Sequence, residues 1–206
     1  MLKKEHVAAK IFRDLTWHFA GKEDELFLTF DDGPTPEITP WILSVLKEYD
    51  AKATFFCIGG KVERFPELYN QIVDDGHSIG NHGYLHMNGW RTGTEKYVRN
   101  VERAACFINS NLFRPPYGRI RPKQISMLKQ HFKIIMWDVI SRDYDNDISG
   151  EECLENVLDY TESGSIIVFH DNLKAEKNLK YTLPKFLEHF TKQNYTFNSI
   201  ESVDLV

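Results

Sequence analysis

Cysteine is scarce in this 206-residue chain, which contains only Cys57, Cys106 and Cys153. The three lie far apart and form no C-x-x-C pair, so the sequence indicates neither a zinc ribbon nor a disulfide scaffold. We expect free, buried thiols, as in a protein of a reducing compartment.

Long apolar runs are missing as well. No segment approaches the ~20 apolar residues that cross a bilayer. The N-terminal segment 7–19 is interrupted by Lys10, Arg13, Asp14 and His18, which is not typical of a signal-peptide core. A cytoplasmic location is therefore the default expectation, with a secreted or periplasmic location as the alternative.

An excess of positive charge is also lacking. Lys and Arg number 25 against 30 Asp and Glu, which gives a formal net charge of -5. This balance gives no support for nucleic acid or an anionic membrane as a partner. The composition leaves the oligomeric state open.

No linker, internal repeat or low-complexity stretch divides the chain, so we expect a single domain. Residues 1–25 are poorly patterned and predict an N-terminal extension packed on a domain of residues 26–206. In that domain, strand-like apolar runs alternate with helical patterns. The predicted strands are Leu26–Phe30, Ala53–Ile58, Ser78–Gly80, Asn111–Arg114, Lys133–Trp137, Ser165–Phe169 and Tyr195–Phe197. The predicted helices are Pro40–Tyr49, Pro66–Asp75, Thr94–Asn109, Pro122–Gln130, Gly150–Thr161 and Leu183–Lys192. Repeated βα units imply a parallel sheet with helices outside, and the count suits an α/β barrel of seven or eight parallel strands.

Residue types that carry chemistry follow the ends of these predicted strands. They are Asp31, Asp32, His77, His82, Arg114, Asp143 and His170. In βα folds the carboxyl ends of the strands face one rim, where catalytic groups gather. We therefore expect these distant segments to meet at one site.

Two adjacent carboxylates, Asp31 and Asp32, stand at the first of these ends, before the turn residues Gly33 and Pro34. Successive side chains of a strand point to opposite sides, so one carboxylate can bind a metal while the other accepts a proton. A solvated Asp-Asp-Gly-Pro turn is the alternative interpretation.

A histidine pair, His77 and His82, follows the second helix. Two neutral imidazoles and one carboxylate are a frequent catalytic ligand set for zinc that leaves positions open for water. The alternative is that both are incidental residues of a polar loop, since His86 shows that the region is simply rich in histidine.

Two further segments complete the set. Arg114 precedes two prolines that stiffen the chain, so it could pair with a carboxylate, and the Tyr117 amide could donate to an oxyanion. His170 directly follows an apolar strand and could act as a general acid beside a carboxylate. The alternatives are a polyproline turn with a surface arginine and a histidine that caps a strand end.

Taken together, the motifs Thr-Phe-Asp-Asp-Gly-Pro, His-Ser-x-x-Asn-His and Arg-Pro-Pro-Tyr-Gly resemble those of the polysaccharide deacetylase family, also called the NodB-homology domain or carbohydrate esterase family 4. The resemblance runs from about Leu26 to the end of the last helix. It implies a distorted (β/α) barrel and a hydrolase that removes acetyl groups from N-acetylated sugars in chitin oligomers, peptidoglycan or related glycans.

The resemblance implies a metal site and a base. Asp32, His77 and His82 would bind one divalent metal, zinc above all, with cobalt, nickel or manganese as alternatives. Asp31 would be the general base, and Arg114 would orient it and favour its charged form.

The resemblance also implies an acid and a substrate pocket. His170 would be the general acid and Asp143 its partner. The Tyr117 amide would stabilise the oxyanion, while Tyr144 and Phe169 would line the pocket for the acetyl methyl group.

The chain departs from the family pattern at Gly83, Ile140, Tyr144 and Val168–Phe169. These positions put the shape of the substrate pocket in doubt, so the substrate stays open. An enzyme for a small or lipid-linked acylated sugar, or an esterase for O-acetyl xylan, is one alternative. A non-catalytic carbohydrate- or metal-binding domain is another, although the chain retains both Asp31 and His170.

Overall fold

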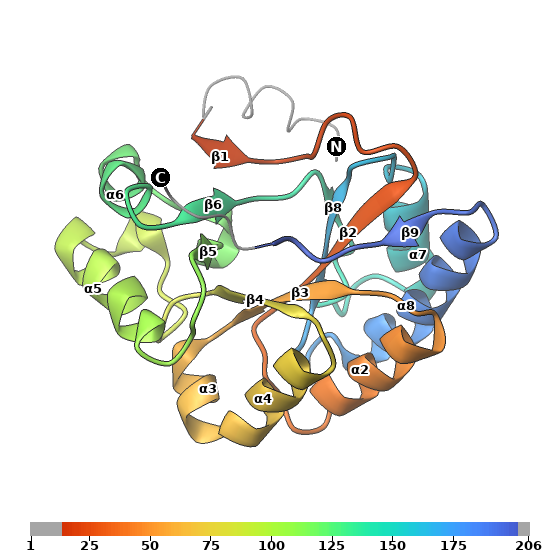
Figure 1. The fold of residues 1–206 in the computed structure, drawn as a ribbon, viewed down its shortest axis with the longest axis horizontal. Coiled ribbons are helices and arrows are strands. Elements are labelled where there is room, and N and C mark those ends of the chain that lie inside the picture. Colours follow the sequence, from red (N-terminus) through yellow and green to blue (C-terminus); the bar gives the residue numbers. More distant parts are fainter. Residues whose placement is uncertain (1–13, 202–206) are drawn as a thin grey trace.

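A curved sheet of parallel strands forms the centre of the computed structural model, which describes residues 14–201 (Figure 1). Its strands are β1 (Leu15–Thr16), β2 (Glu25–Asp31), β3 (Ala53–Cys57), β4 (Ser78–Asn81), β5 (Leu112–Phe113), β6 (Lys133–Ile135), β7 (Val139–Ile140), β8 (Ile166–His170) and β9 (Thr196–Phe197). Eight of them follow the order β1-β6-β5-β4-β3-β2-β8-β7, and β9 pairs with β2. Within residues 14–201 no pairing joins β1 to β7, so the barrel is open there. The predicted α/β architecture of seven or eight parallel strands is confirmed.

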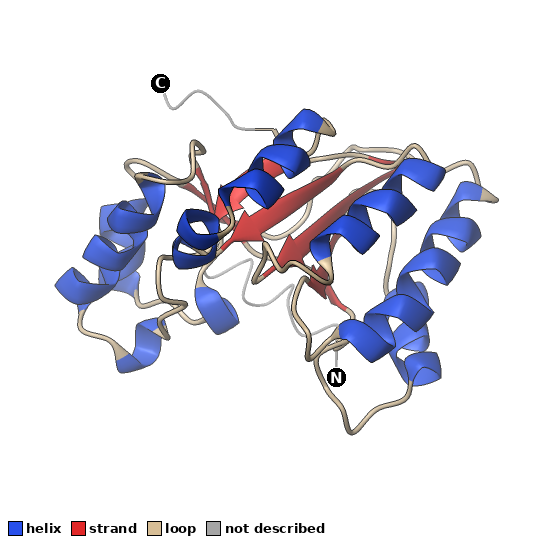
Figure 2. Ribbon diagram, turned by 90° about the horizontal axis from the view of Figure 1, so that it is seen from below, coloured by secondary structure: helices blue, strands red, loops and turns tan. Residues whose placement is uncertain are grey.

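Helices cover the outer face of the sheet (Figure 2). They are α2 (Thr39–Glu48), α3 (Gly59–Arg64), α4 (Pro66–Asp74), α5 (Thr94–Ala105), α6 (Pro122–Leu128), α7 (Gly150–Leu158) and α8 (Glu176–Thr191), with short 3₁₀ turns at Gly89–Arg91 and Pro116–Gly118. Each helix lies in a connection between two successive strands, and successive parallel strands that pair as neighbours are joined by such crossovers. All the carboxyl ends of the strands therefore face the same rim.

Alternation along β2 shows how the strands separate the core from the site. Leu26, Leu28 and Phe30 pack outward with the helices, and all three are fully buried. Thr29 and Asp31 point to the inner side, where Arg114 reaches both. Burying one large apolar side chain is worth about 1.5–3 kcal/mol, so the outward residues fix the strand and thereby aim the polar ones inward.

The last helix begins earlier than the sequence predicts. It starts at Glu176 and runs through Pro184, although proline removes a helical hydrogen bond at a cost of about 3 kcal/mol. The apolar residues Leu179, Leu183 and Phe186 of this helix are fully buried. Their combined burial outweighs the cost of the proline.

The segment before β2 is tied to the sheet. β1 pairs with β6, and the His18 ring bonds Asp138 at 2.8 Å while the Ser165 hydroxyl donates to the same carboxylate at 3.0 Å. Residues 1–13 of the predicted N-terminal extension lie outside the described residues.

The three cysteines are free. Two are buried as expected, but Cys106 is exposed, so the prediction of a buried thiol is wrong for that residue. None of the helices described between residues 14 and 201 is long and apolar enough to cross a membrane.

Candidate active site

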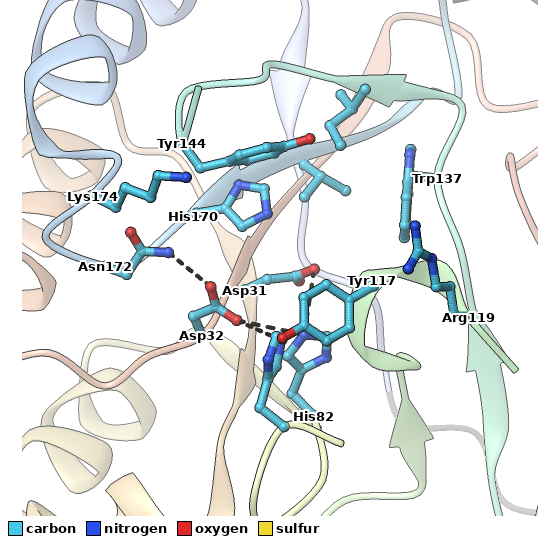
Figure 3. Close-up of a pocket in the computed structure, with 13 residues that line it drawn as sticks. Asp31, Asp32, His82, Tyr117, Arg119, Trp137, Tyr144, His170, Asn172 and Lys174 are labelled. Atoms are coloured by element: carbon cyan, nitrogen blue, oxygen red, sulfur yellow. Dashed lines mark hydrogen bonds and ion pairs between the residues drawn. The ribbon is translucent and has the colours of Figure 1, made fainter. Parts of the chain in front are cut away.

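A cavity of about 510 Å³ opens at the carboxyl ends of the strands, and the residues that line it come from loops far apart in the sequence (Figure 3). Asp31 ends β2 and His170 ends β8, and these two residues are register partners on neighbouring strands. Both lie at the cavity, as does His82, which follows β4. As expected, the carboxyl ends of the strands bring Asp31, His82 and His170 to one cavity.

Arg114 is the buried anchor of the site. Its side chain is fully buried and donates to Asp31 Oδ1 at 2.8 Å, to Thr29 Oγ1 at 2.7 Å and to the carbonyl oxygens of Ile135 and Met136 at 3.3 and 2.9 Å. Four acceptors hold the guanidinium in one orientation, and its charge compensates the buried Asp31 carboxylate. The predicted contact between Arg114 and Asp31 is present.

The turn after β2 separates the two aspartates. Asp32 adopts a left-handed backbone with φ of 79°. At Gly33 a Cβ atom would lie 2.1 Å from Asp171 Oδ2, so only glycine fits. Thr39 donates to the same Asp171 oxygen at 2.6 Å, and burial nevertheless raises the pKa of Asp171 to about 7. This packing fixes the turn that directs Asp32 toward the cavity.

Two histidines of one loop face Asp32. His82 Nε2 lies 3.7 Å and His86 Nε2 lies 3.1 Å from Asp32 Oδ1. His82 Nδ1 bonds the Arg114 carbonyl oxygen at 2.8 Å, which makes Nδ1 the donor and leaves Nε2 as the free lone pair. Burial lowers the pKa of His82 to about 4, so its ring is neutral near pH 7.

The Asp32 carboxylate is charged in this setting. Burial on its own raises the pKa of Asp32, but the contact with His86 and the charge that His82 and His170 carry when protonated outweigh burial and hold the pKa well below its usual range. Its Oδ1 atom is nonetheless buried without a geometrically sound hydrogen bond among the described residues. A buried carboxylate oxygen that faces two imidazoles fits a cation.

The three residues fit a divalent transition metal. Asp32, His82 and His86 each offer one ligand atom, and these atoms lie within 4.8 Å of one another. Two imidazole nitrogens and one carboxylate oxygen are a donor set suited to zinc and similar ions, with positions left for water and substrate.

His77 is not part of this group. The prediction that it binds the metal together with Asp32 and His82 is wrong, because its side chain lies away from both. His77 precedes β4, whereas His82 follows it, so five residue steps along the strand direction, about 16 Å, separate the two positions. The His77 Nδ1 atom accepts from the Ala53 amide at 3.3 Å, and burial lowers its pKa to about 4. It is a neutral residue at the opposite end of the sheet.

Asn172 holds the other oxygen of the aspartate. Its side-chain amide donates to Asp32 Oδ2 at 2.7 Å, and its own oxygen accepts from the Ala175 amide at 3.0 Å, just before α8 (Figure 3). The contact leaves Oδ1 as the atom turned to the histidines.

His170 and Asp143 form the predicted pair. His170 Nδ1 bonds Asp143 Oδ1 at 2.7 Å, and the His170 backbone amide donates to Oδ2 at 2.7 Å. Burial favours the neutral ring, but the charge and hydrogen bond of Asp143, with the charges of Asp31 and Asp32, raise the pKa of His170 to about 9. A ring that stays protonated near neutral pH can serve as a proton donor.

The apolar wall of the cavity differs from the prediction at one position. Tyr144 lines the cavity and packs edge-on against His170, with 4.7 Å between ring centroids. Phe169 does not line it, because the alternation of β8 turns this ring outward onto Phe186, where it is fully buried. Val168 takes its place in the lining.

Tyr117 stands in a strained turn beside the cavity. It has φ of 61°, and its ring packs on His86 with 4.5 Å between centroids. Within residues 14–201 no hydrogen bond occupies the Tyr117 amide. The amide is therefore available as a donor, as predicted.

Seven residues that sequence reasoning did not assign to the site also line the cavity: His86, Arg119, Trp137, Ile140, Val168, Asn172 and Lys174. The signal for His86 is its position after β4 and its spacing of four residues from His82. A residue before a strand and one after it lie at opposite edges of the sheet, and that rule separates His77 from His86.

Comparisons with known proteins show similarity along most of the chain. The family model for polysaccharide deacetylase matches residues 20–132. The chain is 32% identical over 197 residues to the peptidoglycan-N-acetylglucosamine deacetylase of Bacillus cereus, covering 92% of both chains. It is 33% identical over 165 residues to the chitooligosaccharide deacetylase of Azorhizobium caulinodans, covering 75% of this chain and 77% of that protein.

Among solved structures, the chain resembles the Bc1960 peptidoglycan N-acetylglucosamine deacetylase in complex with a hydroxybenzamide derivative. The TM-score is 0.86 at 29% identity, over 93% of this chain and 94% of the other.

Proposed function

Because the chain belongs to the polysaccharide deacetylase family, we propose that it is a metal-dependent hydrolase that removes acetyl groups from N-acetylated sugars of a glycan. The observation that carries this proposal is the pairing of two proton-transfer groups around one cavity. Asp31, held by Arg114, and His170, held by Asp143, flank the group of Asp32, His82 and His86.

Asp32, His82 and His86 are the residues that would hold the cation, and zinc is the ion we propose. A divalent ion there would supply Lewis acidity, polarising an amide carbonyl and making water a stronger acid near neutral pH. All remaining steps are carried by side chains and amides of the protein.

Asp31 is the general base in this proposal. Its Oδ1 is held by Arg114, while Oδ2 lies 3.9 Å from His82 Nε2 at the edge of the ligand group. Arg114 holds the carboxylate in one orientation, so Asp31 accepts the proton of the attacking water as the oxygen bonds to the acetyl carbon. Tyr144, Ile140 and Val168 line the cavity where the acetyl methyl group would sit.

His170 and Tyr117 act on the tetrahedral stage. The Tyr117 amide donates to the oxyanion that develops on the former carbonyl oxygen. His170, protonated through Asp143, then gives its proton to the departing sugar nitrogen, which leaves as the amine. Acetate and a free amino sugar are the products.

Acetate release from N-acetylglucosamine oligomers, with and without a chelator, tests the proposal. Asp31→Asn should abolish turnover while the protein still binds its metal, because Asp31 is the base and not a ligand. Near-normal turnover of Asp31→Asn would refute the assignment of the base. Activity that survives chelation would refute the metal role, and saccharide binding without acetate release under any metal would favour a non-catalytic binding domain.

A further inference from the structure

Two cations at the rim of the cavity have no acidic partner. Arg119 and Lys174 both line it and lie on opposite sides of Asp31 and His170 (Figure 3). Within residues 14–201 neither forms an ion pair, whereas the deeper cation, Arg114, is paired with Asp31. Both side chains can therefore meet a negatively charged group that approaches the opening of the cavity.

Arg119 is held in place by its neighbours. Its guanidinium carbon lies 5.3 Å from the centroid of the Trp90 ring, within range of a cation–π interaction. The Trp90 indole nitrogen donates to the Ile120 carbonyl oxygen at 3.2 Å, and the Gly89 amide donates to the Arg119 carbonyl oxygen at 3.1 Å. The two loops are thus bonded together, and the guanidinium is positioned before any ligand arrives, which reduces the entropy lost on binding.

The surroundings of Arg119 suit a sugar polymer. Trp90 and Tyr117 are exposed by 57% and 59%, and such ring faces pack well against sugar rings. Asp31 and Asp32 lie at the floor of the cavity, where the reacting acetamide would sit, so a further anionic group on a substrate would meet the charge of Arg119 at the opening. A planar guanidinium binds a carboxylate through two parallel hydrogen bonds.

We propose that Arg119 determines specificity by binding a carboxylate on a sugar adjacent to the one that carries the reactive acetamide. The preferred substrate class is then an acidic acetylated glycan rather than a neutral one. This inference rests on the proposed function, because it assumes that the acetamide occupies the cavity beside Asp31 and His170.

A matched pair of substrates tests this inference. One is an N-acetylated oligosaccharide with a carboxylate-bearing ether on alternate sugars, and the other is the same oligosaccharide with each carboxylate converted to the neutral carboxamide. The values of kcat/KM for acetate release are measured on both with the wild-type protein and with Arg119→Gln. We expect the substitution to reduce kcat/KM on the acid about tenfold more than on the amide, through KM, because a charge-assisted hydrogen bond is lost only with the acid.

Two further variants sharpen the comparison. Arg119→Lys should restore part of the preference for the acid, because the charge remains without the planar geometry. Lys123→Gln, an exposed cation on α6 that does not line the cavity, should leave the preference unchanged. Equal losses on acid and amide with Arg119→Gln, or no loss on either, would overturn the inference while leaving the proposed function intact. Failure of the wild-type protein to release acetate from any acetylated glycan would instead count against the proposed function.

Discussion

Replacement of Asp143 by asparagine tests the proton donor most directly. Asp143 is fully buried and accepts three hydrogen bonds, from the His170 ring, the His170 amide and the Tyr144 amide, at 2.7, 2.7 and 3.0 Å. All three partners are donors, so an asparagine NH₂ group must face one of them without an acceptor. We expect a loss of about 1–3 kcal/mol in the free energy of unfolding from that unsatisfied contact.

The same replacement changes the protonation of His170, and the direction of this change is defined. The pKa of His170 is raised from 6.5 to about 9, mainly because the Asp143 charge and hydrogen bond outweigh burial. Loss of one neighbouring charge lowers the pKa by about two units, to about 7. At pH 8 the protonated fraction of His170 then falls from about 0.9 to about 0.1, whereas at pH 6 it falls only from nearly 1 to about 0.9. The alkaline limb of kcat/KM should move to lower pH.

The assay is the dependence of kcat/KM on pH between about 5 and 10, at saturating metal, for the wild-type protein and Asp143→Asn. Asp145→Asn is the matched control, because Asp145 lies in the same loop but pairs with Arg142 rather than with His170. An alkaline limb that stays in place in Asp143→Asn, or one that Asp145→Asn shifts equally, would show that Asp143 does not set the protonation of the acid.

Three further predictions concern the metal site and its support. His86→Gln should weaken zinc binding by tenfold or more in a chelator competition assay, whereas His77→Gln should not; equal effects would mean that the ligand set is wrong. Arg114→Met should lower the free energy of unfolding in urea by about 3–5 kcal/mol, because it leaves the buried Asp31 charge without its partner, and a loss below 1 kcal/mol would contradict that account. Asn172→Ala should raise the zinc dissociation constant about tenfold, since the aspartate ligand loses its orienting donor, and unchanged affinity would show that the amide only caps α8.

The sequence predicts the longer elements of the fold well. Buried strands such as Ala53–Cys57 and Ile166–His170 carry continuous apolar runs bounded by glycine, so their positions can be read directly. Two-residue strands such as Leu15–Thr16 and Val139–Ile140 carry no such pattern, because their pairing depends on neighbours far away in the chain. The start of α8 is hidden by Pro184, whose local preference is overridden by packing.

The sequence predicts correctly those residues of the site that lie at the ends of strands. Asp31, Arg114, Asp143 and His170 meet the expected partners because each lies at or just after the end of a strand. His77 was predicted to bind the metal, but it lies before β4, whereas His82 and His86 both follow that strand and face Asp32.

A second limit applies to residues placed by loops. The prediction that Phe169 lines the cavity is wrong, because neighbouring residues of a strand point to opposite sides of the sheet. Arg119 and Asn172 lie on loops whose paths are set by packing rather than by periodicity, so sequence pattern alone gives no reason to select them.

The double role of Asn172 constrains how this protein can vary. One side-chain amide contacts Asp32, the proposed metal ligand that follows β2, and also anchors the first residues that lead into α8, and Lys174 lies between those two attachments. Insertions or deletions in that short span would therefore disturb ion retention and the charge at the cavity mouth together. New substrate preferences at this side of the opening are accessible through exchange of Lys174 itself, with the length of the segment kept constant.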